Sequence, residues 1–147
     1  MPTANITRSK VLIDLLSSSE SDKNSCSFFH EIFDGKSVLG PNGKYYFMFE
    51  SDLTGDTNKK VLNVLKYESR KLTFLKYGTV QSRFEFALNR WTKCHCHIQG
   101  GFIVLDCFTE FLKADISEKY AGIVVRYKLY VSNSLFGIYN LHITFKC

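Results

Sequence analysis

Proline and glycine are scarce in this chain, at 2 and 9 of 147 residues. Such low contents exclude a collagen-like or low-complexity chain. No apolar run approaches the roughly 18 residues that a membrane-spanning helix needs, and Met1 to Lys10 lacks the apolar core of a signal peptide. The 5 cysteines are odd in number and irregularly spaced, so they do not suggest a disulfide framework. We therefore expect a soluble protein of a reducing compartment, the cytosol or the nucleus.

Catalytic motifs are also missing. The chain has no Gly-x-Ser-x-Gly, no phosphate-binding glycine-rich loop and no His-Glu-x-x-His. Carboxylates such as Asp52, Asp56, Asp106 and Glu110 are scattered, and none forms an evident acid–base pair. We therefore expect a protein that binds and assembles, not an enzyme, and we expect no cofactor.

Apolar and aromatic residues are plentiful, at 45% and 15%. A chain of 147 residues with this composition suits one domain with a real core. The 19 basic residues exceed the 14 acidic ones, giving a net charge of +5. This excess is compatible with a phosphate-bearing or anionic lipid partner, and equally with ordinary surface charge.

The N-terminal region combines an apolar segment with a polar one. The polar stretch Ser17 to Ser27 predicts a mobile linker. We therefore expect residues 1–27 to be a flexible arm and residues 28–147 to be the globular domain. The apolar segment predicts a short helix or an anchor for self-association, and its residues are Val11, Leu12, Ile13, Leu15 and Leu16.

Several segments predict strands. The stretch from Lys44 to Ser51 is rich in Tyr and Phe, and residues 123–131 and 137–146 alternate between apolar and polar side chains. The last two segments, joined at Asn133-Ser134, predict an antiparallel hairpin. Residues 60–68 fit either a strand or a helix, because their apolar residues match both spacings.

Two helices are predicted in the second half. Ser82 and Glu85 have the spacing of a capping box, and Phe84 and Trp91 lie on the same face of a helix that would begin there. A largely buried helix is predicted over 102–112, with a strand for 102–108 as the alternative. The predicted class is α+β, a mainly antiparallel sheet packed by two or more helices.

The stretch Cys94-His95-Cys96-His97 contains good zinc ligands. In an extended chain Cys94 and Cys96 would share one face and the histidines the other, so a single ion would need ligands from elsewhere, such as Cys107 or His142. Cys94 and Cys96 are therefore only weak metal candidates, with two core thiols as the alternative interpretation.

Basic residues interleave with aromatic ones, as a surface that stacks bases and contacts phosphates requires. Arg126, Lys128 and Tyr130 would share one face of a strand. The candidate surface for ribonucleoprotein or lipid consists of Lys59, Lys60, Arg70, Lys71, Arg126 and Lys128.

Three segments between Lys59 and Phe145 follow one another in an order that resembles the globular domain of rhabdovirus matrix proteins. In that family a strand leads into a helix that ends in a tryptophan, an apolar helix follows, and a long alternating strand comes next. The corresponding segments here are VLNVLKYESRKLTFLKYGTVQSRFEFALNRW, GGFIVLDCFTEFLKA and YAGIVVRYKLYVSNS.

This resemblance implies a viral structural protein that self-associates and bridges the ribonucleoprotein and the membrane. Its implied partners are further copies of itself, viral ribonucleoprotein or RNA, and an anionic membrane surface. Its implied location is the host cytoplasm or nucleus and the inner layer of the virion. The alternatives are a small nucleic-acid-binding viral regulator that suppresses host defence, and a zinc-stabilised adaptor.

Overall fold

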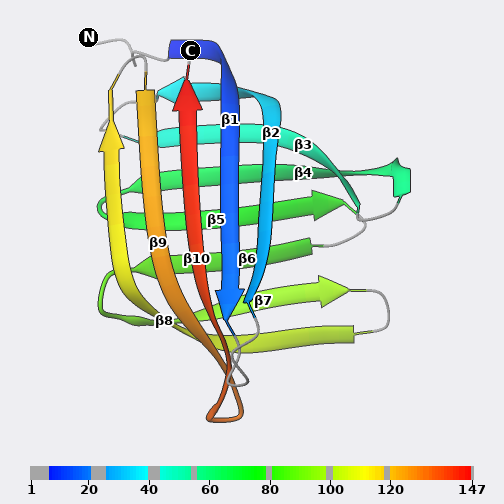
Figure 1. Ribbon diagram of the computed structural model, residues 1–147, viewed down its shortest axis with the longest axis vertical. Helices are drawn as coiled ribbons and strands as arrows, with labels where there is room; N and C mark the ends of the chain where they lie inside the picture. Colours follow the sequence, from blue (N-terminus) through cyan, green and yellow to red (C-terminus); the bar gives the residue numbers. More distant parts are fainter. Residues whose placement is uncertain are drawn as a thin grey trace, which may run out of the picture.

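The computed structural model describes residues 7–20, 26–39, 44–53, 56–78, 81–98, 101–117 and 120–146 (Figure 1). All secondary structure in these ranges is β, and no helix in them is long and apolar enough to cross a membrane. The strands are β1 (Thr7–Glu20), β2 (Cys26–Leu39), β3 (Tyr45–Leu53), β4 (Asp56–Glu68), β5 (Lys71–Gly78), β6 (Gln81–Ala87), β7 (Trp91–Ile98), β8 (Gly101–Ile116), β9 (Tyr120–Val131) and β10 (Ser134–Lys146).

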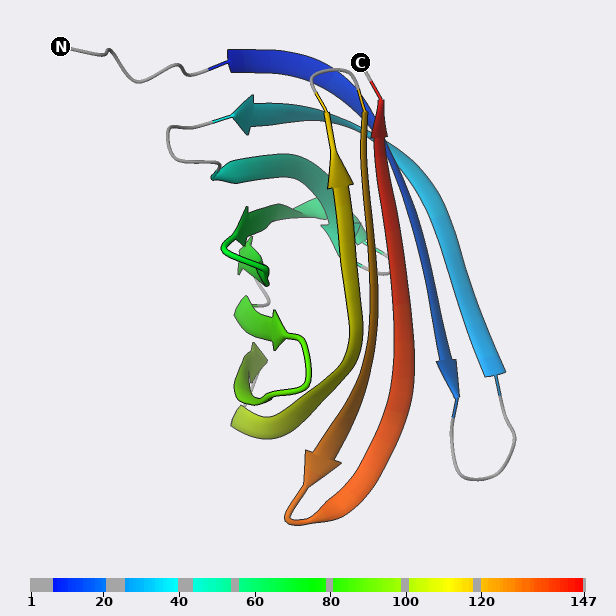
Figure 2. The ribbon, with the colours of Figure 1, turned by 90° about the vertical axis from the view of Figure 1, so that its left-hand side faces the viewer.

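The strands form a closed antiparallel barrel. Each strand pairs with the next along the chain, and β1 pairs with β10 to close the ring. Closure satisfies the backbone hydrogen bonds that an open sheet would leave at its two edges. The barrel is flattened: β3 to β7 run across the long strands β8, β9, β10, β1 and β2 in Figure 1, and Figure 2 shows the two groups as facing layers.

Two hairpins turn within two residues. Ser69 and Arg70 link β4 to β5 with φ of 50° and 61°, and Ser132 and Asn133 link β9 to β10 with φ of 49° and 68°. Positive φ at both central residues matches the right-handed twist of paired strands. The predicted C-terminal hairpin is therefore confirmed, with its turn one residue earlier than expected.

The predicted helix over 84–91 is wrong. Residues 81–87 form β6, and β7 begins at Trp91. Ser82, Phe84 and Phe86 also fit a period of two, and cross-strand pairing with β5 selects that period. Glu85 pairs with Arg83 on its own strand and with Lys71 on the neighbouring β5 instead of capping a helix.

The predicted helix over 102–112 is also wrong, and the strand alternative is correct. Residues 101–116 form β8, because β7 and β9 flank this apolar run and pair with it on both sides. The strand reading of 60–68 is correct too, since these residues lie in β4. The fold class is therefore all-β, not α+β.

The predicted N-terminal arm differs from the structure. Residues 7–20 are a barrel strand, and β1 is hydrogen-bonded to both β10 and β2. Ile13 is fully buried in the core, whereas Leu12 and Leu16 point outward and are 53% and 41% exposed. The three described apolar residues of this segment are thus divided between core and surface, as the two faces of a strand require. The side chains of Val11 and Leu15 lie outside the described residues.

Candidate ligand-binding site on the inner face of the barrel

One region of the interior is tightly packed. We call it the sealed region, and its side chains are 0–4% exposed. The rings of Phe47 and Phe145 stack across the barrel with centroids 3.7 Å apart and planes 11° apart. The members of the sealed region are Ile13, Phe47, Leu65, Ile123, Ile143 and Phe145.

A second region of the same inner face reaches solvent. Along β8, the exposed fraction of successive inward residues falls from 41% at Ile103 to 8% at Leu105 and 0% at Cys107. Inward side chains alternate with outward ones along a barrel strand, so this gradient marks where the interior meets water. It lies where β5 and β7 end and where β6 and β8 begin, on the right in Figure 1.

Cross-strand pairing continues this region onto three more strands. On β7, Cys96 lies opposite Ile103 of β8 on one side and opposite Ser82 of β6 on the other. Ser82 in turn lies opposite Lys76 of β5. Residues that pair across neighbouring strands share one face of the sheet. Lys76, Ser82 and Cys96 are each partly exposed. We call Lys76, Ser82, Cys96 and Ile103 the open row.

Lys76 is a charged residue on an apolar face. Its partner on β4 is Asn63, which is buried, and the inward residues before it on β5 are Leu72 and Phe74. Burial lowers the pKa of Lys76, and the nearby Cys96 partly offsets that change. The ammonium lies 5.5 Å from the centroid of the Phe74 ring. Among the described residues, no carboxylate forms a salt bridge with it.

Asn63, by contrast, is satisfied within the protein. Its Nδ2 lies 2.8 Å from the Ser51 hydroxyl and 3.2 and 3.4 Å from the carbonyl oxygens of Val61 and Phe49. Buried polar groups in native proteins normally find such partners. The inner face therefore holds two polar groups side by side. The amide nitrogen of Asn63 is fully hydrogen-bonded, whereas the amine of Lys76 has no carboxylate partner among the described residues.

Aromatic side chains lie behind the open row. Phe74 and Phe84 pair across β5 and β6. Tyr127, on β9, lies 6.5 Å from Phe84 and 4.5 Å from Phe86 between ring centroids, and it stacks on Tyr139 at 5.3 Å. Burial raises the pKa of Tyr127 well above its ordinary value, so this phenol stays neutral. These rings connect the two layers of the barrel.

The two metal candidates lie on the inner face, as an extended chain requires. Cys94 is buried and Cys96 belongs to the open row, whereas His95 and His97 point outward and contact the ring of Phe102. Interaction with the Cys107 thiol, together with burial, raises the pKa of Cys94. Within the described ranges, no three His, Cys, Asp or Glu side chains gather as a metal site would need.

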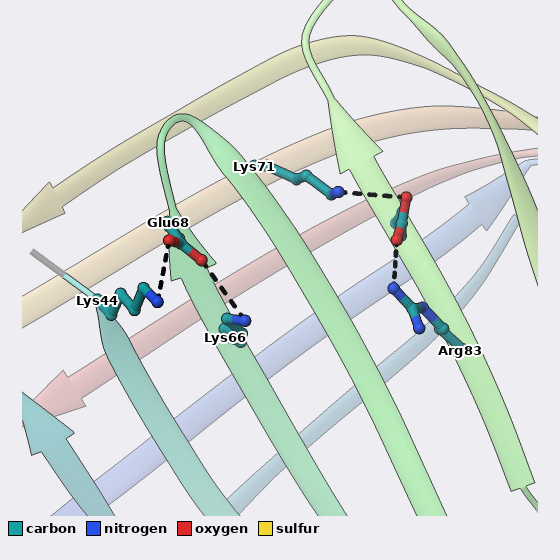
Figure 3. Close-up of polar contacts among 6 residues, drawn as sticks. Lys44, Lys66, Glu68, Lys71 and Arg83 are labelled. Carbon is teal, nitrogen blue, oxygen red and sulfur yellow. Dashed lines mark hydrogen bonds and ion pairs between the residues drawn. The ribbon is translucent and has the colours of Figure 1, made fainter. Parts of the chain in front are cut away.

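The outer face of β3 to β6 carries a charged cluster (Figure 3). Glu68 contacts the ammonium groups of Lys44 and Lys66 at 3.4 and 3.5 Å. A second carboxylate, Glu85, contacts Lys71 at 3.5 Å and Arg83 at 2.6 Å. Burial alone would raise the pKa of Glu85, but the hydrogen bond from Arg83 and the charges of Lys71 and Arg83 outweigh it and lower the pKa.

This cluster lines a pocket of about 280 Å³ that includes Ser69 and Thr73. The cations around it are thus already paired with carboxylates. Such exposed pairs typically contribute about 0–1 kcal/mol each. The cluster suits a solvated outer surface of the sheet.

The basic residues predicted as one surface do not gather in one place. Arg70 and Lys71 lie at the β4–β5 turn, whereas Lys60 lies near the other end of β4. The length of strand between Lys60 and the turn is roughly 25 Å, because a β-strand rises about 3.3 Å per residue. Arg126 and Lys128 lie on β9, where Glu110 accepts hydrogen bonds from them at 3.1 and 2.7 Å. The side chain of Lys59 lies outside the described residues.

An outer pocket of about 580 Å³ was not predicted from the sequence. Trp91, which is 60% exposed, lies 5.1 Å from both Phe108 and Tyr130 between ring centroids. Lys93 pairs with Asp106 on the wall of this pocket. The helical interpretation of 84–91 put Trp91 on the same helix face as Phe84, whereas in the strands Phe84 faces inward and Trp91 is exposed.

Lys76 was also missed as a site residue, although the sequence carries a signal for it. In KLTFLKYG the residues Leu72, Phe74 and Lys76 follow a period of two, which puts the lysine on the apolar face of a strand. Only the closed barrel makes that face an interior.

Comparisons with known proteins identify a family. A family model described as "Domain of unknown function (DUF1934)" matches residues 13–143, so the chain belongs to this family. The crystal structure of the ywiB protein from Bacillus subtilis is similar, with a TM-score of 0.82 and 17% identity. The match covers 95% of this chain and 92% of the other. Similarity at this level of identity establishes a shared fold. A comparison with curated proteins finds no match.

These findings overturn the resemblance to rhabdovirus matrix proteins. The order strand, Trp-ending helix, apolar helix and strand is absent, because both helices are strands. The matrix-type function is wrong, and nothing in the comparisons supports the viral regulator or the zinc-stabilised adaptor. Self-association through the outward residues Leu12 and Leu16 stays a prediction.

Proposed function

For this member of the DUF1934 family, we propose that the barrel is a binding protein for a small molecule, which it holds against the open row. The observation that carries the proposal is the gradient along the inner face of β8, from 41% exposed at Ile103 to 0% at Cys107. A closed barrel that seals its whole interior would bury all of its inward side chains. Here one region of the interior stays in contact with solvent.

The chemistry of the open row supports this proposal. Ligand sites are typically apolar and aromatic surfaces with a few polar groups that fix orientation, and the mouths of β-barrels are common places for them. The open row offers an amine, a hydroxyl and a thiol next to Phe74 and Phe84. We propose binding rather than catalysis, because these groups have no carboxylate among the described residues to activate them as nucleophile or base.

The test is a fluorescence titration with an amphipathic probe such as anilinonaphthalene sulfonate. The wild-type protein should bind the probe saturably. Cys96→Trp fills the open row with an indole and should weaken binding by roughly tenfold or more, about 1.4 kcal/mol.

His95→Trp is the matched control. It adds the same indole one residue away, on the outer face of β7, and should leave binding unchanged. Circular dichroism verifies that both variants fold. If Cys96→Trp does not fold, the pair Ile103→Trp and Val104→Trp repeats the comparison on β8, where both side chains are already exposed. Absence of saturable binding by the wild type, or equal losses in both members of a pair, would contradict the proposal.

A further inference from the structure

The charges of the barrel are divided unequally between its two faces. Among strand residues whose side chains are described, the charged ones point outward, except Lys76 on β5 and Glu31 on β2. The outward cations of the charged clusters have carboxylate partners. Within the described part of the chain, no salt bridge involves Lys76 or Glu31. Lys76 is therefore an inner-face cation that has no carboxylate partner among the described residues.

Such a residue is costly to the fold. Removing an ammonium even partly from water without a carboxylate partner opposes folding, and a methionine of similar length would avoid that cost. An anionic ligand that binds beside the ammonium would offset this unfavourable free energy. A single cation compensates a single negative charge.

The neighbours of Lys76 suit an oxyanion. Ser82 lies directly opposite Lys76, and Cys96 lies directly opposite Ser82. Opposed residues on neighbouring strands have their Cβ atoms about 4.5–5.5 Å apart. An ammonium, a hydroxyl and a thiol can therefore all donate to one carboxylate-sized group. Hydrogen bonds to a charged acceptor are about twice as strong as those between neutral groups.

The apolar surroundings limit the rest of the ligand. Phe74 and Phe84 pair one step further along β5 and β6 on the same face, and Ile103 ends the row. Behind them, the contacts of Tyr127 with Phe84 and Phe86 connect the two layers. The sealed region beyond these residues is filled by protein side chains, which limits the length of the apolar chain that a ligand can place on this face.

We infer that the ligand of the open row is a small amphipathic monoanion, a medium-chain or aryl carboxylate, whose head group pairs with Nζ of Lys76 and whose apolar part lies against Phe74, Phe84 and Ile103. This inference rests on the proposed binding function. It adds the chemical class of the ligand and the residue that selects it.

The experiment compares decanoate with decanol as competitors of bound anilinonaphthalene sulfonate. The two competitors share a chain length and differ in the head group. Wild-type protein should prefer decanoate by roughly tenfold. Lys76→Met should abolish that preference, and Lys76→Arg should keep it because the positive charge remains.

Lys66→Met is the matched control. It removes a lysine from the outer face of β4, where the ammonium lies 5.9 Å from the centroid of the Tyr46 ring, and should leave the preference intact. The probe is itself an anion, so direct binding of radiolabelled decanol to Lys76→Met verifies that the site remains.

The outcomes separate the two proposals. If decanol competes as well as decanoate with the wild type, or if Lys76→Met keeps the preference, the monoanion inference is wrong and the binding function stands. If neither the probe, decanoate nor decanol binds the wild type, both fail.

Discussion

The sealed region and the open row lie on one continuous inner face, yet they are built from different residues. In the sealed region, rings and branched aliphatic side chains exclude water, and the Phe47 and Phe145 rings stack at 3.7 Å. In the open row, Lys76, Ser82 and Cys96 replace them and remain partly exposed. Burial stabilises the fold in proportion to the apolar area removed from water. Stability therefore depends mainly on the sealed region, and the proposed binding depends on the open row.

The largest expected difference concerns aromatic truncation. Phe145→Ala removes a ring that is 2% exposed and should cost about 3–5 kcal/mol of unfolding free energy. Phe84→Ala, next to the open row, should cost roughly half as much because its ring is only partly buried. Urea denaturation measures both, with the exposed Phe136→Ala as control. Equal losses at Phe145 and Phe84 would remove the distinction between the regions.

A smaller effect is expected from a single added methyl group. At Gly35, a Cβ would lie 2.5 Å from the Met48 carbonyl oxygen and would collide with the side chain of Ile13. Gly35→Ala should therefore cost about 1–3 kcal/mol through overpacking. At Gly101, where β8 begins, a Cβ meets no atom within 4 Å, so Gly101→Ala should be close to neutral. Thermal unfolding of the pair tests how tightly each region is packed.

Replacing Lys76 should stabilise the protein at neutral pH, by on the order of 1 kcal/mol for Lys76→Met. The folded-state pKa of Lys76 is lowered by burial, so the unfolded chain binds the proton more tightly. Wild-type stability should therefore rise with pH from the lowered pKa up to that of an ordinary lysine. Cys96 is the titratable neighbour that faces Lys76.

Urea denaturation of wild type and Lys76→Met at neutral pH and at about pH 10 measures this difference. The advantage of the variant should shrink at the higher pH. A Lys76→Met protein that is less stable than wild type at both values would mean that the amine has an internal partner, which would also weaken the inferred ligand class.

The smallest effect is expected on the outer face. The pKa of Glu85 is lowered because its pairing with Arg83 and Lys71 outweighs burial. Ionised Glu85 therefore adds to the free energy of unfolding at any pH above the pKa of an unfolded glutamate. This stabilisation is lost as the pH falls through the lowered pKa of the folded state. For a partly exposed pair this contribution should stay below about 1 kcal/mol. Acid titration of stability should be flatter in Glu85→Gln than in wild type, with the exposed Glu50→Gln as control.

The strands at the C-terminal end could be predicted because their pattern has one interpretation. Apolar residues recur at every second position in much of 123–131 and 137–146, and β9 and β10 bury most of them in the core, among them Ile123, Val125, Leu129, Leu141, Ile143 and Phe145. Residues 84–91 could not, because Phe84 and Trp91 fit a helical stripe while Phe84 and Phe86 fit a strand. Local spacing alone does not decide between these periods, and pairing with β5 and β7 does.

The candidate site illustrates the same limit. Lys76 has a sequence signal, since it shares the period of Leu72 and Phe74. Lys76 is a candidate binding residue because it has no carboxylate partner among the described residues. Which side chains surround it is determined by the pairing and packing of distant strands, which the local sequence does not show. The predicted basic surface could not be located from the sequence either, because its residues resemble one another in charge but lie on separate strands, such as β4 and β9.

By itself, the sequence determined a single domain with a real core and two alternating strands near its C-terminus. The tertiary structure decided that the segment with Leu12, Ile13 and Leu16 is a strand, since its partners β10 and β2 include the far end of the chain. It also decided which face is the interior and where that interior reaches water. The physical reason is that a β-strand satisfies its backbone through hydrogen bonds to distant segments, so its identity is fixed only when those segments meet.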